Sequence, residues 1–191
     1  MTKTYYDIVI VGGGVVGSSI AYFLTRNRDF RGTVAVLERD PSYATASSSL
    51  SSSGIRQQYG TAPNIHMSAW SVEFLRSSIE YLSTDGHVAD VNFHENGYLI
   101  LGGADRYNWL LARNEIQRRE GVAVDLFSPT ELKERFPYLH TDDIAIASLG
   151  TKNEGWFDGP GLHQAFRRRA RSQGADYIDA TVTGVEVTSS G

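Results

Sequence analysis

A chain of 191 residues, 41% of them hydrophobic, is long enough to bury one large core or two small ones, and this composition excludes a disordered chain. The formal net charge of −4 gives no overall basic field of the kind that binds nucleic acid or anionic membranes. The chain has no cysteine, and therefore no disulfide, thiolate metal site or catalytic thiol. This fits a reducing compartment, and we expect the cytoplasm, or the mitochondrial matrix if the source is eukaryotic.

The first predicted elements are a buried strand over residues 5–11 and a helix over residues 15–26. The strand is a continuous apolar run, as in parallel strands covered on both faces. Between the two lie Gly12, Gly14 and Gly17, in the spacing Gly-x-Gly-x-x-Gly. There the first glycine permits a tight turn, the second lets the backbone approach a pyrophosphate, and the third lets the helix pack closely. The motif predicts a dinucleotide at the helix N-terminus and leaves NAD, NADP and FAD open.

Residues 8–24 also have the apolar character of a signal peptide or a short membrane span. We favour a buried strand and helix, because the segment is shorter than the ~20 residues of a span and carries glycines at the phosphate-turn spacing. We therefore predict no transmembrane segment. The inward face of the helix is predicted to consist of Val16, Ile20, Phe23 and Leu24.

A second buried strand is predicted over residues 33–38, and it ends in an acid, Glu38. In this fingerprint an acid in that neighbourhood binds a ribose 2′-hydroxyl. A nicotinamide domain would continue through a helix to a third strand, whereas residues 41–54 here form a loop with seven serines. Such tracts are usually flexible linkers. The specific polar segment over residues 54–59, GIRQQY, favours an ordered ligand-binding loop instead.

Helical and strand patterns then alternate through the middle of the chain. A helix is expected over residues 65–82, with a stripe facing a core that consists of Ile65, Ala69, Val72, Leu75, Ile79 and Leu82. Residues 86–149 read as a mixed insertion with strands over 91–94, 98–101, 124–127 and 144–149, a helix over 105–120 and a short helix before Pro137. Asn96-Gly97 signals a hairpin. Ser128, Pro129 and Glu131 have the pattern of a capping box.

The last part of the chain returns to a helix followed by strands. Asp158 or Gly159 caps this helix, which is predicted to bury Leu162, Phe166 and Ala170. Strands are expected at 177–178 and 182–187. They would supply the third strand of the nucleotide-binding sheet, which is missing directly after residues 33–38. The five histidines lack the spacing of a metal site, so no metal is expected.

Four segments taken together resemble the flavin-dependent D-amino acid oxidase superfamily: YDIVIVGGGVVGSSIAYFL, VLERD, SSGIRQQYG and EGWFDGPGLHQAF. The branch with sarcosine, dimethylglycine and glycine oxidases and dehydrogenases is the most similar. The resemblance implies an α/β fold: a Rossmann-like FAD-binding domain of the glutathione reductase type with an inserted α+β substrate domain, incomplete at the C-terminus. We expect residues 1–85 and 150–191 in the FAD-binding domain and 86–149 in the substrate domain.

By this resemblance the cofactor is FAD. The residues implied to bind it are Gly12, Gly14, Gly17, Glu38, Arg39, Ala46, Ser47, Ser48, Ser53 and Gly54, with the backbone of Val182 at the adenine. Some relatives tether FAD through His or Cys. Because this chain has no cysteine and residues 42–54 contain no histidine, we expect noncovalent binding.

Arg56 is the candidate for gripping a substrate carboxylate, because relatives of the sarcosine oxidase type place an arginine just after this loop. An arginine paired with a local acid, or lying at the surface, is the alternative. The resemblance implies oxidation of the C–N bond of a small amino acid or N-methyl amino acid by hydride transfer to flavin, with oxygen or an electron-transfer partner as acceptor.

Two other functions stay open: a non-catalytic flavoprotein-fold assembly factor for a respiratory complex, and an FAD-dependent 2-hydroxy acid dehydrogenase. Since family members are longer, the 191-residue piece alone is expected to be inactive and poorly soluble, with an unpaired sheet edge.

Overall fold

The computed structural model describes residues 5–188, which divide into two compact units. The first unit comprises Met1–Ser52, Ser78–Val91 and Asp158–Gly191, and the second comprises Ser53–Ser77 and Asn92–Phe157. These bounds differ from the domain bounds expected above, since residues 53–77 and 150–157 group with the second unit and 86–91 with the first. The assignment of the units to cofactor and substrate remains a prediction.

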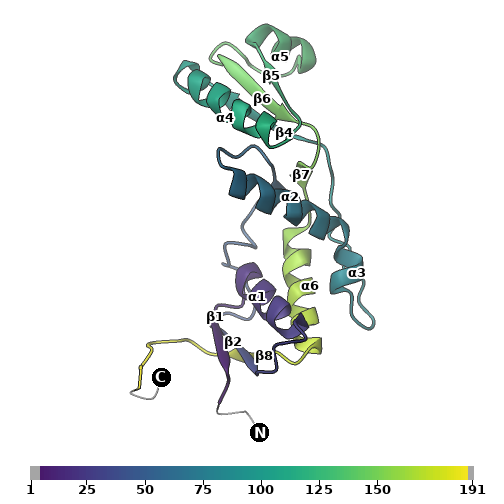
Figure 1. The fold of residues 1–191 in the computed structure, drawn as a ribbon, viewed down its shortest axis with the longest axis vertical. Coiled ribbons are helices and arrows are strands. Elements are labelled where there is room, and N and C mark those ends of the chain that lie inside the picture. Colours follow the sequence, from purple (N-terminus) through teal and green to yellow (C-terminus); the bar gives the residue numbers. More distant parts are fainter. Residues whose placement is uncertain (1–4, 189–191) are drawn as a thin grey trace. The chain divides into compact units, whose positions relative to one another are not determined.

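The first unit is built on a parallel sheet with the strand order β1-β2-β8 (Figure 1). The strands are β1 (Ile8–Val11), β2 (Val34–Glu38) and β8 (Asp176–Asp179), in a register that pairs Ile8 with Val34 and Ala35 with Asp176. The middle strand is the buried one, with Val34, Ala35 and Val36 all in the core. The predicted late return to the sheet is therefore confirmed at 177–178, whereas residues 182–187 form no strand.

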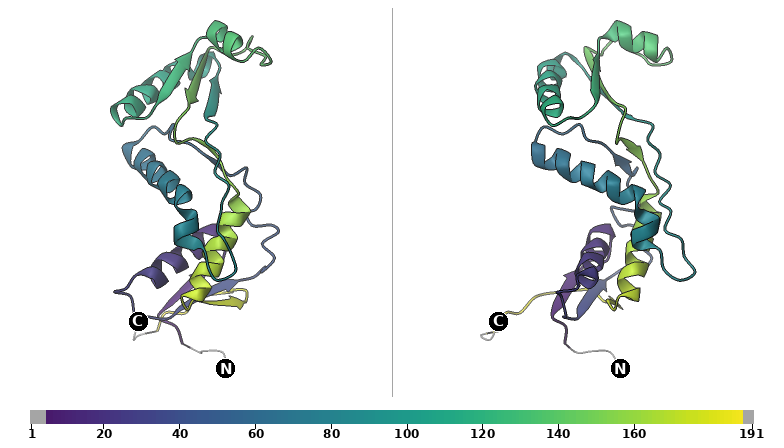
Figure 2. Two further views of the ribbon diagram at one scale, coloured as in Figure 1. Left: turned by 90° about the vertical axis from the view of Figure 1, so that its right-hand side faces the viewer. Right: turned by 45° about the vertical axis from the view of Figure 1, so that its right-hand side comes forward.

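Helix α1 (Val15–Arg26) has the predicted bounds, but it buries a different face. Its buried residues are Gly17, Ser18, Ala21 and Tyr22. Val16, Ile20 and Phe23 are 69%, 45% and 38% exposed, so the predicted inward face was wrong. The reason is close packing against α6 (Gly159–Ser172), which lies beside α1 in both views of Figure 2. The face that meets α6 includes the large ring of Tyr22, which is fully buried.

Helix α6 begins and packs as predicted. Asp158 is its N-cap, and the side chain accepts a hydrogen bond of 2.8 Å from the backbone N–H of Gly161. Leu162, Phe166 and Ala170 are all buried. The ring of Phe166 lies 5.4 Å from that of Tyr22 on α1, centroid to centroid.

The second unit contains an antiparallel sheet with the order β4-β6-β5, made of β4 (Tyr98–Gly102), β6 (Ile146–Gly150) and β5 (Val124–Phe127). A short pair, β3 (Gly54–Ile55) and β7 (Gly155–Trp156), stands apart from it. The expected hairpin at Asn96-Gly97 was wrong: β4 pairs with β6, and residues 91–94 contribute only a bridge from His94 to Trp156. Gly97 instead donates its N–H to the carbonyl of Glu154, at 3.0 Å.

The helices of the second unit are α2 (Ala62–Arg76), the 3-10 turn η1 (Ala104–Arg106), α4 (Tyr107–Arg119) and α5 (Pro129–Arg135). The capping box of Ser128 and Glu131 at the start of α5 is confirmed. The single helix expected over 65–82 is two helices, because the chain leaves helical geometry at Ser77 before α3 (Ser78–Leu82), which belongs to the first unit. Among residues 5–188 no helix has the length and hydropathy needed to cross a bilayer.

Candidate functional site

The glycine turn between β1 and α1 has the geometry that its spacing predicts. Gly12 has φ +92°, a left-handed conformation that favours glycine, and Gly14 is the N-cap of α1. A Cβ atom on Gly17 would lie 1.9 Å from the carbonyl oxygen of Gly12, so only glycine fits there. A Cβ atom on Gly14 would meet nothing closer than Ser48 Oγ at 3.7 Å. Gly17 is therefore required by the fold, whereas Gly14 leaves open space in front of the helix N-terminus.

The Gly13 peptide is held on its N–H side by Glu38. The N–H of Gly13 donates to Glu38 Oε2 at 2.8 Å, and the N–H of Asp40 donates to Glu38 Oε1 at 2.9 Å. The acid at the end of β2 is thus turned toward the glycine turn, as the dinucleotide fingerprint expects. Both carboxylate oxygens keep lone pairs for further donors, such as ribose hydroxyls.

The carbonyl oxygen of Gly13, which belongs to the following peptide group, is held by two side chains that the sequence did not single out. Ser18 Oγ and His163 Nε2 lie 2.7 Å and 2.8 Å from the Gly13 oxygen, and both donate, because a carbonyl only accepts. The hydroxyl of Tyr177 lies 3.0 Å from Ser18 Oγ. His163 is buried, and this burial lowers the pKa of its imidazole. Its one sequence signal is its position directly after the inward-facing Leu162.

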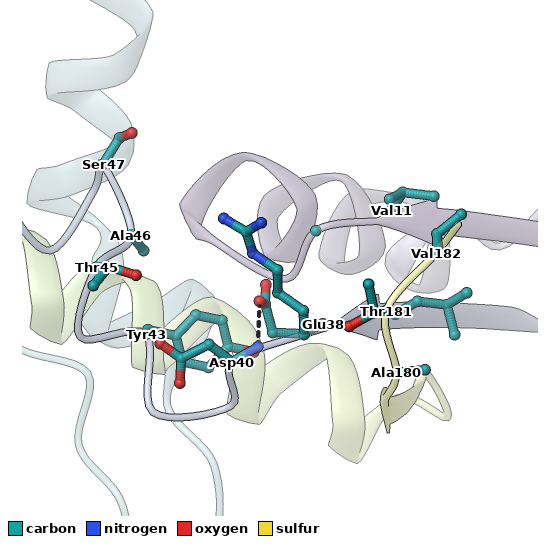
Figure 3. Close-up of a pocket in the computed structure, with 13 residues that line it drawn as sticks. Val11, Glu38, Asp40, Tyr43, Thr45, Ala46, Ser47, Ala180, Thr181 and Val182 are labelled. Carbon is teal, nitrogen blue, oxygen red and sulfur yellow. Dashed lines mark hydrogen bonds between the residues drawn. The ribbon is translucent and has the colours of Figure 1, made fainter. Parts of the chain in front are cut away.

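A cavity of about 410 Å³ lies at the carboxyl ends of β1 and β2. Its lining consists of Val11, Gly12, Leu37, Glu38, Arg39, Asp40, Tyr43, Thr45, Ala46, Ser47, Ala180, Thr181 and Val182. Figure 3 shows the loop with Ala46 and Ser47 on one side, Val182 on the other and Glu38 between them. The structure therefore brings together six of the predicted cofactor residues around one cavity: Gly12, Glu38, Arg39, Ala46, Ser47 and Val182.

The serine-rich loop is folded into successive turns. Backbone hydrogen bonds join Tyr43 to Asp40, Ala46 to Tyr43 and Ser49 to Ala46, at 2.9 to 3.1 Å. The Tyr43 side chain is buried. Ser48 Oγ is also buried and has no hydrogen-bond partner among residues 5–188. A buried hydroxyl without a partner, close to the open space at Gly14, is suited to a ligand oxygen.

The other predicted residues lie in the second unit. Ser53 has a left-handed backbone, φ +54°, and Gly54 begins β3, where a Cβ atom would lie 3.0 Å from the Tyr98 ring. The guanidinium carbon of Arg56 lies 5.3 Å from the ring centroids of both Tyr59 and Tyr98. Among the described residues Arg56 forms no salt bridge, so its donors are not occupied by a local acid.

Glu154 is a further residue that sequence reasoning missed. Its side chain is fully buried, and its carboxylate accepts hydrogen bonds from Gln57 N–H and Gln58 Nε2, each at 2.7 Å. Burial raises the pKa of this carboxyl, while those two hydrogen bonds and the charge of Arg56 act in the opposite direction. No spacing or periodicity in the sequence marks an acid at this position as buried.

The residues of the first unit fit FAD. The free N-terminus of α1 suits a pyrophosphate, and the open space at Gly14 lets the phosphates approach. Glu38 suits a ribose, and the backbone at 180–182 borders the cavity where an adenine would lie. Within residues 5–188 no group of three or more His, Cys, Asp or Glu side chains could hold a metal ion.

Comparisons with known proteins agree with this geometry. The family model described as FAD dependent oxidoreductase, DAO, matches residues 7–191. A bovine protein named FAD-dependent oxidoreductase domain-containing protein 1 is 43% identical over 180 residues, which cover 93% of this chain and 37% of that protein. Sarcosine oxidase subunit beta of Arthrobacter is 30% identical, over 95% of this chain and 45% of its own.

Among solved structures, L-proline dehydrogenase of P. horikoshii superimposes with a TM-score of 0.77 at 29% identity, covering 96% of this chain and 46% of that one. The chain thus spans between about a third and a half of the length of these relatives. The glycine turn, the cavity and the family match lead to one conclusion: the chain belongs to the DAO family of FAD-dependent oxidoreductases.

Proposed function

We propose that this chain supplies the cofactor seat and part of the substrate site of an oxidoreductase that oxidises the C–N bond of a small amino acid or N-methyl amino acid. The observation that carries the proposal is the cavity of the first unit, around which six of the predicted cofactor residues meet from separate stretches of the chain. The names of two relatives, sarcosine oxidase subunit beta and L-proline dehydrogenase, support a secondary amino acid as substrate.

In the first unit, the proposed roles follow the contacts. The helix N-terminus at Gly14 binds the pyrophosphate, the Glu38 carboxylate accepts from ribose hydroxyls, and the Ser48 hydroxyl donates to the cofactor. The cofactor is held noncovalently, because the lining of the cavity includes no histidine and the chain has no cysteine.

In the second unit, Arg56 binds the substrate carboxylate through two parallel hydrogen bonds. The rings of Tyr59 and Tyr98 flank its guanidinium, so aromatic faces limit its orientation. FAD, when bound, would supply the acceptor for the hydride that leaves the carbon next to the amine. The role of the protein is to bind the amine in its unprotonated form, to hold the substrate carboxylate and to exclude water from the product.

The test is anaerobic reduction of the purified full-length protein. We expect flavin absorbance in the visible range, and bleaching of that absorbance by sarcosine or L-proline but not by 2-hydroxyglutarate. Bleaching by 2-hydroxyglutarate alone would support the hydroxy acid dehydrogenase. Bound FAD that no amine reduces, together with stoichiometric capture of a respiratory subunit, would support the assembly factor. A protein without any flavin would contradict all three.

For the electron acceptor and for the cellular compartment we propose two alternatives each. Oxygen and an electron-transfer partner both fit, and reoxidation of the reduced protein under air, compared with reoxidation by a dye under argon, separates them. We propose a reducing compartment, the cytoplasm or the mitochondrial matrix, for a chain without cysteine.

A further inference from the structure

Glu154 is a fully buried carboxylate in the second unit, directly before β7. Carboxylates are almost never buried completely unless hydrogen bonds or charges compensate them. Here the compensation is local: one oxygen accepts from the N–H of Gln57 and the other from the side-chain amide of Gln58. The acid therefore has a defined orientation, and both partners directly follow Arg56 in the chain.

Gln58 extends this arrangement to the sheet. Its amide nitrogen also donates to the carbonyl of Tyr98, at 2.7 Å, and its amide oxygen accepts from Ser148 Oγ, at 2.5 Å. Both polar ends of the Gln58 side chain are thus in use. Glu154 is bonded through Gln58 to β4, which carries the Tyr98 ring that lies beneath Arg56, and to β6, which carries Ser148.

The peptide group that follows Arg56 is held at both of its polar ends. The Arg56 carbonyl accepts a hydrogen bond of 2.6 Å from Ser68 Oγ on α2, and the Gln57 N–H of the same peptide group donates to Glu154. One aromatic neighbour, Tyr98, is bonded through its carbonyl to the same Gln58 amide. The backbone from which the guanidinium projects and one ring that flanks it thus depend on one buried carboxylate.

We propose that Glu154 is a positioning residue that holds Arg56 in the geometry needed to bind a substrate carboxylate. The inference rests on the proposed role of Arg56. In Glu154→Gln, an NH₂ group would replace one of the two oxygens and meet the N–H donors of Gln57 or Gln58. Gln58 would then have to turn its amide, losing Tyr98 or Ser148, and the Arg56 segment would shift.

The experiment measures how tightly the full-length FAD-loaded protein binds methoxyacetate, a sarcosine analogue with an ether oxygen in place of the amine. Binding is followed by the change in flavin absorbance, for the parent protein, Glu154→Gln, Arg56→Gln and the double variant. The matched control is Glu95→Gln, since Glu95 also accepts from a backbone N–H, that of Asn153, and from a side chain, that of Arg76.

We expect Glu154→Gln to weaken methoxyacetate binding about tenfold, with unchanged FAD content and no effect of Glu95→Gln. In the Arg56→Gln background the same change should have almost no further effect, because a positioning residue acts only through the residue that it positions. Equal weakening in both backgrounds would overturn the inference and indicate a general structural role.

The outcomes separate this inference from the proposed function. If Arg56→Gln leaves the affinity unchanged, or if the parent binds no methoxyacetate, the carboxylate role of Arg56 is wrong. If Arg56→Gln weakens binding and Glu154→Gln does not, only the role of Glu154 is wrong. Should Glu154→Gln fail to fold, Ser148→Ala replaces it in the test, because it removes one hydrogen bond of Gln58 and keeps the Glu154 carboxylate. We expect Ser148→Ala to weaken methoxyacetate binding about threefold. An unchanged affinity would overturn the inference.

Discussion

Gly14 and Gly17 are two glycines of one motif with different physical tasks. The oxygen of Gly12 leaves no room for a side chain at Gly17, whereas Gly14 faces open space with only Ser48 Oγ at van der Waals distance. The same substitution at the two positions therefore separates folding of the turn from binding of the cofactor.

We expect Gly17→Ala to destabilise the protein by more than about 2 kcal/mol, because the new methyl group overlaps a backbone oxygen.

Gly14→Ala should leave the thermal unfolding temperature of the cofactor-free protein unchanged and lower the FAD content, because its methyl group occupies the space through which the phosphates approach. Thermal unfolding and visible absorbance measure the two effects. A Gly14→Ala protein with full FAD content would contradict the proposed pyrophosphate seat.

His163 links the glycine turn to pH. Burial lowers the pKa of its imidazole in the folded state, so the unfolded chain takes up the proton more readily. The stabilising effect of neutral His163 is complete above the unfolded pKa of about 6.5 and is lost as the pH falls below it.

Acidification from about pH 7.5 to 5.5 is thus expected to lower the unfolding temperature, and His163→Gln should reduce this dependence, because glutamine can still donate to Gly13 but does not titrate. Unfolding curves at each pH measure it. The control is His87→Gln, an exposed histidine of the same unit. If the unfolding temperature of His163→Gln fell with pH as much as that of the parent, other groups would be responsible for the loss of stability in acid.

At the scale of elements, the start of α5 gives a test that is independent of any ligand. The Ser128 hydroxyl accepts from the Glu131 N–H. The Glu131 carboxylate accepts from the Ser128 hydroxyl and, with a smaller effect, from the Ser128 N–H, and these hydrogen bonds lower the pKa of that carboxylate. We expect Ser128→Ala to lower the free energy of unfolding by about 1 kcal/mol without changing FAD content, measured by denaturant unfolding. Thr130→Ala, an exposed change in the same helix, is the control. A larger effect of the control would contradict the capping role.

Local signals predicted the elements that depend on local chemistry. Helix α1, strand β5 and the capped starts of α5 and α6 follow from glycine spacing, apolar runs and capping residues, and they lie where expected. The glycines and Glu38 could be proposed as cofactor ligands because the glycine turn and the acid after β2 have fixed spacings, whereas the loop residues and Val182 were implied by the family resemblance.

Pairing between segments that lie far apart in the sequence could not be predicted from such local signals. The Asn96-Gly97 signal was overridden because β6, some fifty residues later, pairs with β4. The buried face of α1 depends on α6, and the buried Glu154 has its hydrogen-bond partners at Gln57 and Gln58, almost a hundred residues earlier in the chain. Such choices depend on which surfaces meet after the chain has folded back on itself.

At the scale of the whole molecule, β1 is one of the two terminal strands, with β8, of the sheet that the described residues form in the first unit. Val9 and Val11 on it are 50% and 64% exposed. An exposed apolar edge strand is a template for pairing with another chain. Because the two units are interleaved along the sequence, ending the chain at Ser52, Ser77 or Val91 removes strands or helices from both.

We expect the 191-residue chain to self-associate, and Val9→Lys to reduce this association, because a charge on an edge strand opposes pairing. Sedimentation velocity over a concentration series measures it. Val88→Lys places the same charge on a loop residue that is 73% exposed, and it should have little effect. A monomeric parent chain at all concentrations would contradict the expectation.

Gly13, whose N–H is bonded to Glu38 and whose oxygen is bonded to Ser18 and His163, has a consequence for affinity. With the peptide groups before and after it both held, this residue has little conformational freedom left to lose when a dinucleotide arrives, so most of the entropy of ordering the turn is lost during folding rather than during binding. We therefore expect cofactor affinity to be coupled to the rigidity of the backbone at one residue. Changes that loosen it will release FAD under conditions in which the rest of the protein is still folded.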